Sequence, residues 1–555
     1  MKKLAKGLLI ALSAVMAFSV IGCDRGKDSV EVDASKSQLY VYSYNGGVGT
    51  KWLDNTIARF ESEYAETSFE EGKKGVQVIV AKGKDELKAI ASTNYNVIFS
   101  EQVIYNDLIS QGLLLDISDI VTESLSEITG GQETATIESK LTASQKGAFT
   151  ATNGKYYMLP HYETYTGIAY NIQVFDENRL YFAEDGGFTD LEGERTVGPD
   201  GERGTYDDGL PSSYEEFYLL MEEMLYASPK ITPFIWSGAM TSYTNDLLAG
   251  LWAAYAGRDE FMLNVDFDSS KSGAQADILS FDGGGKPVVT PTTITEETGY
   301  LMSHQAEKYY ALSFLENVLS NPDNRYSKIT ETLTNAGAQE EFVFGSLENK
   351  PIAMLIEGNY WYNEASDDSL FKRAETNHPS EAAKQQYGWM PLPRQLTGSV
   401  TEGNGTKNTL LDTLTSFAFI NANIKNDAVK VKLAKLFLQY CYTNESLVSF
   451  TMDTGCFKGV SYTIPQDKKN LMNSYYQNVC EIREKSDIVY PYSDSGVFLK
   501  NQTKFRFDLG SSIWSSKVGS IPYTYFYTAY EKDKVTARQF FEGAFISETD
   551  WSAYL

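Results

Sequence analysis

The sequence predicts an α/β protein with more than one core. Two observations support this fold class. Short runs rich in β-branched and aromatic residues alternate with segments in which apolar residues recur at helical spacing. The chain has 555 residues, of which 42% are hydrophobic, so it can bury large cores and should divide into two or three domains or lobes.

The N-terminus has the pattern of a secretory signal that ends at a lipid-modified cysteine. Three lysines within the first six residues precede an apolar run over residues 8–21, which is short for a transmembrane helix, and Gly22 leads into Cys23. We therefore expect residues 1–22 to be a signal peptide and Cys23 to carry lipid, because two or more acyl chains anchor a protein stably. A retained N-terminal membrane helix is the alternative. The polar residues 23–37 would form a flexible tether, which places the folded chain outside the cytoplasm at the cell membrane.

The first folded segment alternates strands and helices. Strands are predicted over residues 38–43, 76–80 and 96–100, and helices over residues 52–64, 84–91 and 103–111. Such alternation builds a mostly parallel sheet with helices on both faces, and ligands then bind beyond the carboxyl ends of its strands. This rule singles out Tyr44 and Asn45 after the first strand, and Ser100 and Glu101 after the third. A simple turn after the first strand is the alternative.

The rest of the chain is less regular but continues the α/β pattern. Extended runs are predicted over residues 156–159, 167–171, 352–356 and 417–420, and helices over residues 213–226, 245–255, 304–319 and 427–440. Ser213 and Glu216 occupy the two positions of a capping box at the start of one of these helices. Residues 185–211 should form a long loop, and residues 273–293 a loop or a hairpin.

Charge, cysteine and histidine content argue against several classes of site. The formal net charge of −26 argues against nucleic acid as a partner and against adhesion to anionic lipid. Cysteines 441, 456 and 480 are too few for a disulfide framework and have no metal-ligand spacing. One disulfide bridge between two of them is compatible with the sequence. The histidines, at positions 161, 304 and 378, are scattered, which argues against a histidine-based metal site or triad.

Aromatic residues make up 13% of the chain, and many stand among polar residues. Amphipathic rings suit flat ligands with apolar faces and hydroxyl edges, which describes sugars, whereas most individual rings should pack in cores.

One loop suggests a structural calcium ion, and no other cofactor is expected. Between two glycines at positions 198 and 209 the sequence places Asp200, Glu202, Asp207 and Asp208. Calcium takes several oxygen ligands from a flexible backbone, although the spacing is not that of an EF-hand. A glycine-rich turn with solvated carboxylates is the alternative interpretation.

The order of several motifs resembles a known family. The motifs are NVIFSE at residues 96–101, NGKYYMLP at 153–160, GIAYN at 167–171, AMLIEGNYW at 353–361, YGWMPLP at 387–393 and SFAFIN at 416–421. In this order they are similar to extracellular solute-binding proteins of ABC importers, above all to the carbohydrate-binding class that includes maltose-binding protein. The resemblance covers most of residues 38–455, and the chain is longer than a typical member.

The resemblance implies a two-lobe, periplasmic-binding-protein fold that closes on its ligand about a hinge. Lobe one would comprise residues 38–160 and 415–455, and lobe two residues 161–414 and 456–555, with crossings near residues 159–165 and 411–416. The implied function is capture of a carbohydrate, in particular an oligosaccharide, and its delivery to an ABC permease in the membrane. We expect a monomer that is not an enzyme.

The resemblance also implies roles for individual residues. Trp361 would stack on a sugar ring, with Trp236 and Tyr44 as further stacking candidates. Hydrogen bonds to hydroxyls would come from a polar set that comprises Asn45, Ser100, Glu101, Tyr162, Glu163 and Glu357. A core position for Trp361 and a helix-capping role for Glu357 are the alternatives.

Two other functions stay open at the level of sequence. A secreted, lipid-anchored glycoside hydrolase would also have an aromatic cleft, and needs two carboxylates about 5 to 10 Å apart. No nucleophile motif, P-loop, histidine-rich metal motif or cofactor fingerprint is present in the sequence. A peptide-binding or adhesive surface lipoprotein would share the anchor and the acidity.

Overall fold

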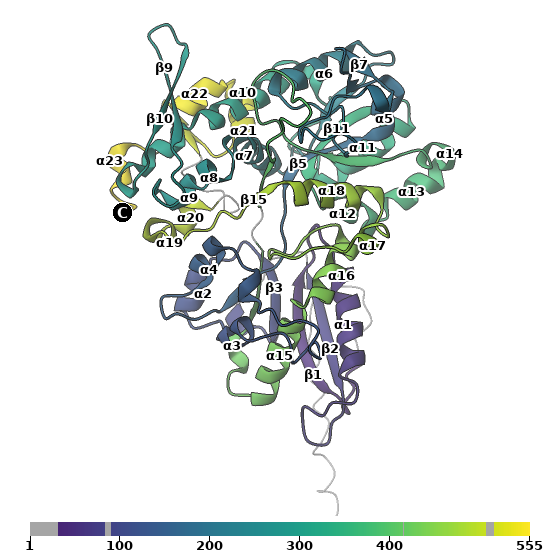
Figure 1. Cartoon of the computed structure of the whole chain (residues 1–555), viewed down its shortest axis with the longest axis vertical. Helices are drawn as coiled ribbons and strands as arrows, with labels where there is room; N and C mark the ends of the chain where they lie inside the picture. Colours follow the sequence, from purple (N-terminus) through teal and green to yellow (C-terminus); the bar gives the residue numbers. More distant parts are fainter. Residues whose placement is uncertain (1–30, 84–89, 414–415, 507–514, 545) are drawn as a thin grey trace, which may run out of the picture.

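The computed structural model describes residues 31–83, 90–413, 416–506, 515–544 and 546–555 (Figure 1). The predicted signal peptide, Cys23 and the first part of the tether lie outside the described residues, as do residues 84–89 of a predicted helix. Among the helices that the structure does describe, none is long and apolar enough to cross a bilayer.

The first sheet forms the centre of lobe one and has five strands in the order β2-β1-β3-β14-β4. The strands are β1 (Ser37–Tyr44), β2 (Val76–Gly83), β3 (Val97–Glu101), β4 (Met158–Pro160) and β14 (Ser416–Ile420). β1 pairs in parallel with β2 and β3, whereas β14 is antiparallel to both β3 and β4. The predicted strands are confirmed, but the sheet is mixed rather than mostly parallel, because β14 is inserted from a distant part of the chain.

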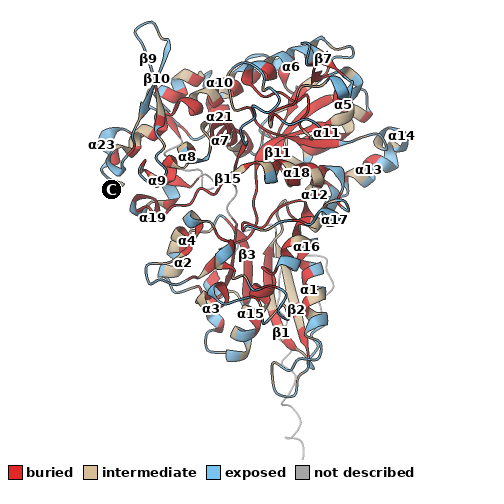
Figure 2. Cartoon of the chain, in the orientation of Figure 1, coloured by how far each residue is buried: buried red, intermediate tan, exposed pale blue. Residues whose placement is uncertain are grey.

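Helices cover this sheet (Figure 1). They are α1 (Lys51–Glu63), α2 (Tyr105–Ser110), α3 (Ser118–Thr122), α4 (Ala143–Phe149), α15 (Ala428–Tyr440) and α16 (Asn444–Thr454). The apolar spacing that predicts α1 buries Trp52, Leu53 and Phe60 against the sheet. The central strands β3 and β14 are buried, the edge strand β2 is only partly buried, and the outer faces of the helices are exposed (Figure 2).

The second sheet forms the centre of lobe two and has the order β12-β5-β11-β8. Its strands are β5 (Thr166–Asn171), β8 (Thr232–Ile235), β11 (Ile352–Gly358) and β12 (Tyr387–Met390). Only β11 and β8 run parallel. All seven residues of β11 are buried, which is typical of a central strand covered on both faces.

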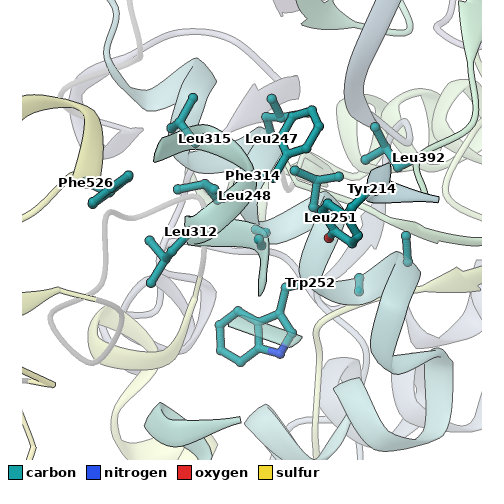
Figure 3. Packing of buried hydrophobic residues seen from close by; sticks show 14 of the residues in the cluster. Tyr214, Leu247, Leu248, Leu251, Trp252, Leu312, Phe314, Leu315, Leu392 and Phe526 are labelled. Atoms are coloured by element: carbon teal, nitrogen blue, oxygen red, sulfur yellow. The ribbon is translucent and has the colours of Figure 1, made fainter. Parts of the chain in front are cut away.

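Lobe two carries more helices than lobe one. Those nearest its sheet are α5 (Ile172–Asn178), α6 (Tyr214–Tyr226), α7 (Ser242–Ala256), α10 (Ala306–Ser320), α11 (Asn335–Leu347), α12 (Trp361–Asp367), α13 (Leu370–Asn377) and α18 (Ser474–Lys485). The capping box predicted at Ser213 and Glu216 is confirmed at the start of α6. Leucines of α7 pack against Leu312, Phe314 and Leu315 of α10, and Phe526 borders this core (Figure 3).

Two additions enlarge lobe two. The segment predicted as a loop or hairpin is a hairpin, formed by β9 (Ala276–Phe281) and β10 (Pro287–Thr292), and it projects from the lobe in Figure 1. The C-terminal segment folds into β16 (Ser516–Val518), β17 (Ile521–Tyr523), α21 (Phe526–Asp533), α22 (Ala537–Glu542) and α23 (Glu548–Trp551). It packs beside α10 and shares its hydrophobic core.

Candidate functional site

Three segments connect the two sheets and are hydrogen-bonded to one another. The first follows β4 and leads into β5, the second leads from β13 (Thr409–Leu411) to β14, and the third follows α16. The Thr413 amide donates to the carbonyl of Thr164 at 2.9 Å, and the Glu163 amide donates to the carbonyl of Phe457 at 2.8 Å. The Asp412 carboxylate also accepts from the Thr164 amide at 3.0 Å. These links make the first segment the centre of a three-segment hinge.

Glu163, predicted to bind substrate, lies inside this hinge with 0% exposure. Arg483 of α18 donates two hydrogen bonds to its carboxylate, from Nε at 3.2 Å and from Nη2 at 3.0 Å. The hydroxyls of Tyr165 and Tyr490 also donate to it. The oxygens of Glu163 therefore already have partners within the chain, and its predicted contact with substrate stays untested.

The end of lobe one that faces lobe two carries Tyr44 at the end of β1, Asn45 directly after it, and Glu101 at the end of β3. Tyr44 and Asn45 are partly exposed, and Glu101 is buried. A Cβ atom built on Gly46 would lie 2.8 Å from Cε1 of Tyr44 and 2.9 Å from Oε1 of Glu101. Both side chains therefore pack closely against the backbone of Gly46, which has no side chain. This agrees with the expectation that the groups at the carboxyl ends of β1 and β3 lie close together.

The end of lobe two that faces lobe one carries a buried carboxyl group. Glu357, at the end of β11, accepts a hydrogen bond from the Gly358 amide at 3.0 Å and one from Gln339 at 3.3 Å. Gln339 also donates to Glu364 at 2.7 Å. Burial, followed by the charge of Glu364, raises the pKa of Glu357 to about 8. Glu357 is therefore largely protonated at neutral pH, and its carboxyl group can both donate and accept hydrogen bonds.

Tyr360 connects the two ends. Its ring lies against Gly47 of lobe one and against Gly358 of lobe two, so that a Cβ atom on either glycine would overlap the ring. Its hydroxyl lies 3.5 Å from that of Tyr243 in α7. Next to this contact, the Asn363 side chain donates to the Gly47 carbonyl at 3.0 Å. The predicted site residues did not include Tyr360 or Tyr243. The signals for Tyr360 were its place in the motif that also contains Glu357 and Trp361, and the run of aromatic residues at 360–362 among polar residues.

Two tryptophans predicted to stack on a sugar are core residues, each with 0% exposure. Trp361 begins α12, and its ring makes edge contacts with Phe342, Tyr387 and Tyr475. Trp236 makes an edge contact with Tyr527 of the C-terminal segment. The structure therefore places both rings in the core, which is the alternative stated for Trp361, and their stacking on a sugar stays untested. Trp361 turns into the core because it is the first helical residue after the turn that directs Tyr360 toward lobe one.

Ser100, in β3, and Tyr162, in the hinge segment after β4, are also buried. Ser100 pairs with Phe417 across the sheet. The Tyr162 amide donates to the Ser416 hydroxyl at 2.9 Å, and that hydroxyl donates to the Tyr162 carbonyl at 3.0 Å. Both residues thus support the sheet and the hinge, and the predicted substrate contact of these side chains stays untested.

The acidic loop predicted to hold calcium has partners of its own. Lys485 of α18 lies 3.0 Å from Oδ2 of Asp200 and 2.9 Å from Oε2 of Glu202. Asp207 accepts from the Asp200 amide and the Thr205 hydroxyl, and Asp208 from the Gly204 amide. The structure therefore supplies a lysine as counter-charge for this loop, and calcium binding there stays a prediction.

Cysteines 441, 456 and 480 are buried and free, so the structure pairs none of these three with another.

Two surface cavities are lined by other residues. One of about 850 Å³ is bordered by α16 and residues 461–468, and its lining includes Arg59, Met452 and Tyr462. The other, of about 430 Å³, is lined by α6 and the β6 (Tyr181–Phe182) and β7 (Phe188–Thr189) hairpin.

Two sheets joined by a three-segment hinge, with polar groups at their facing ends, form the framework that the sequence motifs imply. The family described as "Bacterial extracellular solute-binding protein" matches residues 54–447, which is more than half of the chain. The chain belongs to this family of extracellular solute-binding proteins. Comparison with curated proteins gives no match.

Solved structures similar to this solute-binding protein share little sequence with it. A chitin oligosaccharide binding protein is 14% identical, with a TM-score of 0.47 over 86% of this chain and 94% of the other. The binding protein MsmE from Bacillus subtilis, in an open conformation, is 13% identical, with a TM-score of 0.44 over 86% and 94%. The bacterial solute receptor AcbH, described as having an exclusive preference for β-D-galactopyranose, is 13% identical, with a TM-score of 0.45 over 84% and 94%.

Proposed function

We propose that this solute-binding protein is the receptor of an ABC importer, that it captures a carbohydrate between its two lobes, and that it delivers this carbohydrate to the permease. The observation that carries the proposal is the contact of Gly47 of lobe one with the ring of Tyr360 of lobe two, next to Gly46, on which Tyr44 and Glu101 of lobe one pack. Family membership supports the same function.

The chemistry of these groups favours an uncharged ligand rich in hydroxyls. Phenol, amide and carboxyl groups exchange hydrogen bonds with hydroxyls, and the partly exposed ring of Tyr44 offers an apolar surface to a sugar face. Because Glu357 is largely protonated at neutral pH, it adds a neutral donor rather than a second negative charge. An oligosaccharide fits these groups better than an anionic solute would.

The hinge supplies the mechanism. Gly47 and Tyr360 touch in this structure, so a ligand would enter when the lobes separate and would be enclosed when they approach again. A ligand that contacts both lobes stabilises the closed state by its differential affinity for that state, and the permease can then distinguish loaded from empty protein.

Membrane anchoring through Cys23 is part of the proposal. Cys23→Ser should release the protein from membranes, because the acyl chains supply its affinity for the bilayer. If the variant still sediments with membranes after a high-salt wash, the lipid anchor is excluded as the cause of attachment.

The binding proposal is tested by calorimetric titration of the purified protein with neutral monosaccharides, oligosaccharides and peptides. A sugar should bind and raise the melting temperature by mass action. Tyr44→Ala and Glu101→Gln should each weaken binding by about 1 to 3 kcal/mol, whereas the control Leu219→Ala, on the exposed face of α6, should leave it unchanged. Binding of peptides alone would favour the peptide-binding alternative, and loss of binding only in the Leu219 variant would place the site in the cavity beside α6.

The same samples test the hydrolase alternative. A carboxyl group with a raised pKa beside a second carboxylate is what glycoside hydrolysis requires, and Glu357 and Glu364 share Gln339 as a partner. A binding protein should return the sugar intact. Smaller sugars produced at catalytic rates, and lost in Glu357→Gln, would assign the chain to the hydrolases.

A further inference from the structure

Three acidic side chains from separate elements meet in lobe two, away from the facing sheet ends. They are Glu260 of α8 (Arg258–Phe261), Asp277 of β9 and Glu307 in the first turn of α10. One carboxylate oxygen from each residue lies within 4.8 Å of those of the other two. The sequence did not predict this cluster, because its members are distributed over almost 50 positions and follow no motif.

Glu307 is the deepest of the three. Its side chain is 3% exposed, and its Oε2 atom has no hydrogen-bond partner among the residues that the structure describes. Burial, followed by the charge of Glu260, raises the pKa of Glu307 to about 8. A buried carboxylate oxygen without a partner is costly, so it indicates a ligand that the protein chain itself does not supply.

Neighbouring polar groups position the cluster without neutralising it. Oε1 of Glu260 accepts from the Asp277 amide at 2.7 Å and from the Gln305 side chain at 3.0 Å. Gln305 is fixed in turn, because its oxygen accepts from Trp252 and from Asn264, each at 2.8 Å. Burial raises the pKa of Glu260 as well.

The basic residue nearest to Glu307 in the sequence has partners outside the cluster. Lys308 follows Glu307, but its ammonium group donates to the Ser303 carbonyl at 3.3 Å and lies over the ring of Trp252. Within the described part of the chain, none of the three acidic residues forms an ion pair with a lysine, an arginine or a histidine. The three carboxyl groups therefore meet without a counter-charge from a side chain.

We propose that Glu260, Asp277 and Glu307 bind a calcium ion. Three carboxylates and no nitrogen or sulfur ligand favour a hard cation. Magnesium is usually held through one or two carboxylates and several waters, whereas calcium takes six to eight oxygens at flexible geometry, so a three-carboxylate cluster fits calcium better. Glu260 and Asp277 are only partly buried, which leaves the ion a path from solvent.

The ion would join three elements that are separate in the sequence. Asp277 lies at the base of the projecting β9–β10 hairpin, Glu260 precedes it, and Glu307 begins the helix that carries much of the lobe core. Calcium would therefore fix the hairpin to α8 and α10, and this role does not depend on the identity of the solute.

The test uses the full chain after treatment with a chelator and removal of the chelator. Calcium chloride should bind to one site in calorimetric titration and raise the melting temperature, and magnesium chloride should have a smaller effect. Glu307→Gln and Asp277→Asn should each weaken calcium binding more than about tenfold, because each removes a charged oxygen ligand. Glu340→Gln, whose carboxylate pairs with Arg373 on the surface, serves as the matched control and should bind calcium like the unmodified chain. Asp200→Asn, in the acidic loop partnered by Lys485, tests the second candidate site.

Two results would contradict the proposal that this cluster binds calcium. Calcium without effect on the unmodified chain would mean that protons, not a cation, neutralise the cluster. Binding that survives both Glu307→Gln and Asp277→Asn but is lost in Asp200→Asn would place the ion in the acidic loop. Because Glu307→Gln keeps the size of the side chain and removes a buried like charge, the chelator-treated variant should melt no lower than the unmodified chain, which separates loss of binding from loss of folding.

Discussion

Gly47 of lobe one lies directly against the ring of Tyr360 of lobe two, so closely that a Cβ atom at position 47 would overlap the ring. The other side of the contact is similar, because Gly358 also leaves no room for a side chain beside this ring. The lobes therefore touch at an aromatic ring held between two glycines, three residues from Glu357 and next to Gly46, which packs on Glu101.

Gly47→Ala should keep the lobes from reaching this contact. The added methyl group forces the ring of Tyr360 or the loop to move, at a cost of about 1 to 3 kcal/mol. We expect weaker ligand binding and a larger radius of gyration at saturation in small-angle scattering. Gly193→Ala is the control, because a Cβ atom there meets no atom within 4 Å. An unchanged affinity in Gly47→Ala would show that the contact is not needed for closure.

Trp361→Ala should reduce stability rather than affinity. The ring is enclosed by Phe342, Tyr387 and Tyr475, so its removal leaves a core cavity and should cost about 3 to 5 kcal/mol of unfolding free energy. Urea unfolding measures this loss, and titration below the unfolding transition measures affinity. A variant that is as stable as the unmodified chain but no longer binds ligand would show that Trp361 contacts the ligand.

Breaking the buried ion pair of the hinge should be strongly destabilising. Glu163→Gln leaves the guanidinium of Arg483 buried without its counter-charge, for which we expect a loss of about 3 to 5 kcal/mol. Glu340→Gln, which breaks the exposed ion pair with Arg373, is the comparison and should cost less than about 1 kcal/mol. Equal effects of the two substitutions in chemical unfolding would contradict the central place of Glu163 in the hinge.

Glu357 should make stability depend on pH. Its pKa rises from 4.5 to about 8 in the folded protein, so between these values the folded state binds more protons than the unfolded state, and stability falls as pH rises. Glu357→Gln removes this contribution and should be more stable than the unmodified chain by about 1 to 3 kcal/mol at pH 8, with a smaller difference at pH 5. Melting curves of both proteins across this range measure the difference. A constant difference over the whole range would exclude the raised pKa as its cause.

Local signals in the sequence determined most of the elements. The periodicity of apolar residues predicts β1, β3, β11 and α15 to within a few residues, because burial on one face and backbone hydrogen bonding are properties of neighbouring positions. The capping box of α6 was visible for the same reason, since its two side chains are three residues apart. The motifs and their order were also enough to indicate the family.

The tertiary structure decided which side chains face which partner. Glu163 meets Arg483 across 320 positions, and the acidic residues at 260, 277 and 307 meet only because β9 and α10 pack side by side. In the motif around Glu357, the turn after β11 sends Tyr360 to lobe one and the next residue, Trp361, into the core. Apolar spacing fixes whether a side chain is buried, but the direction of a turn and the packing of distant segments depend on contacts formed by the whole fold, and these determine whether a buried ring is core or interface.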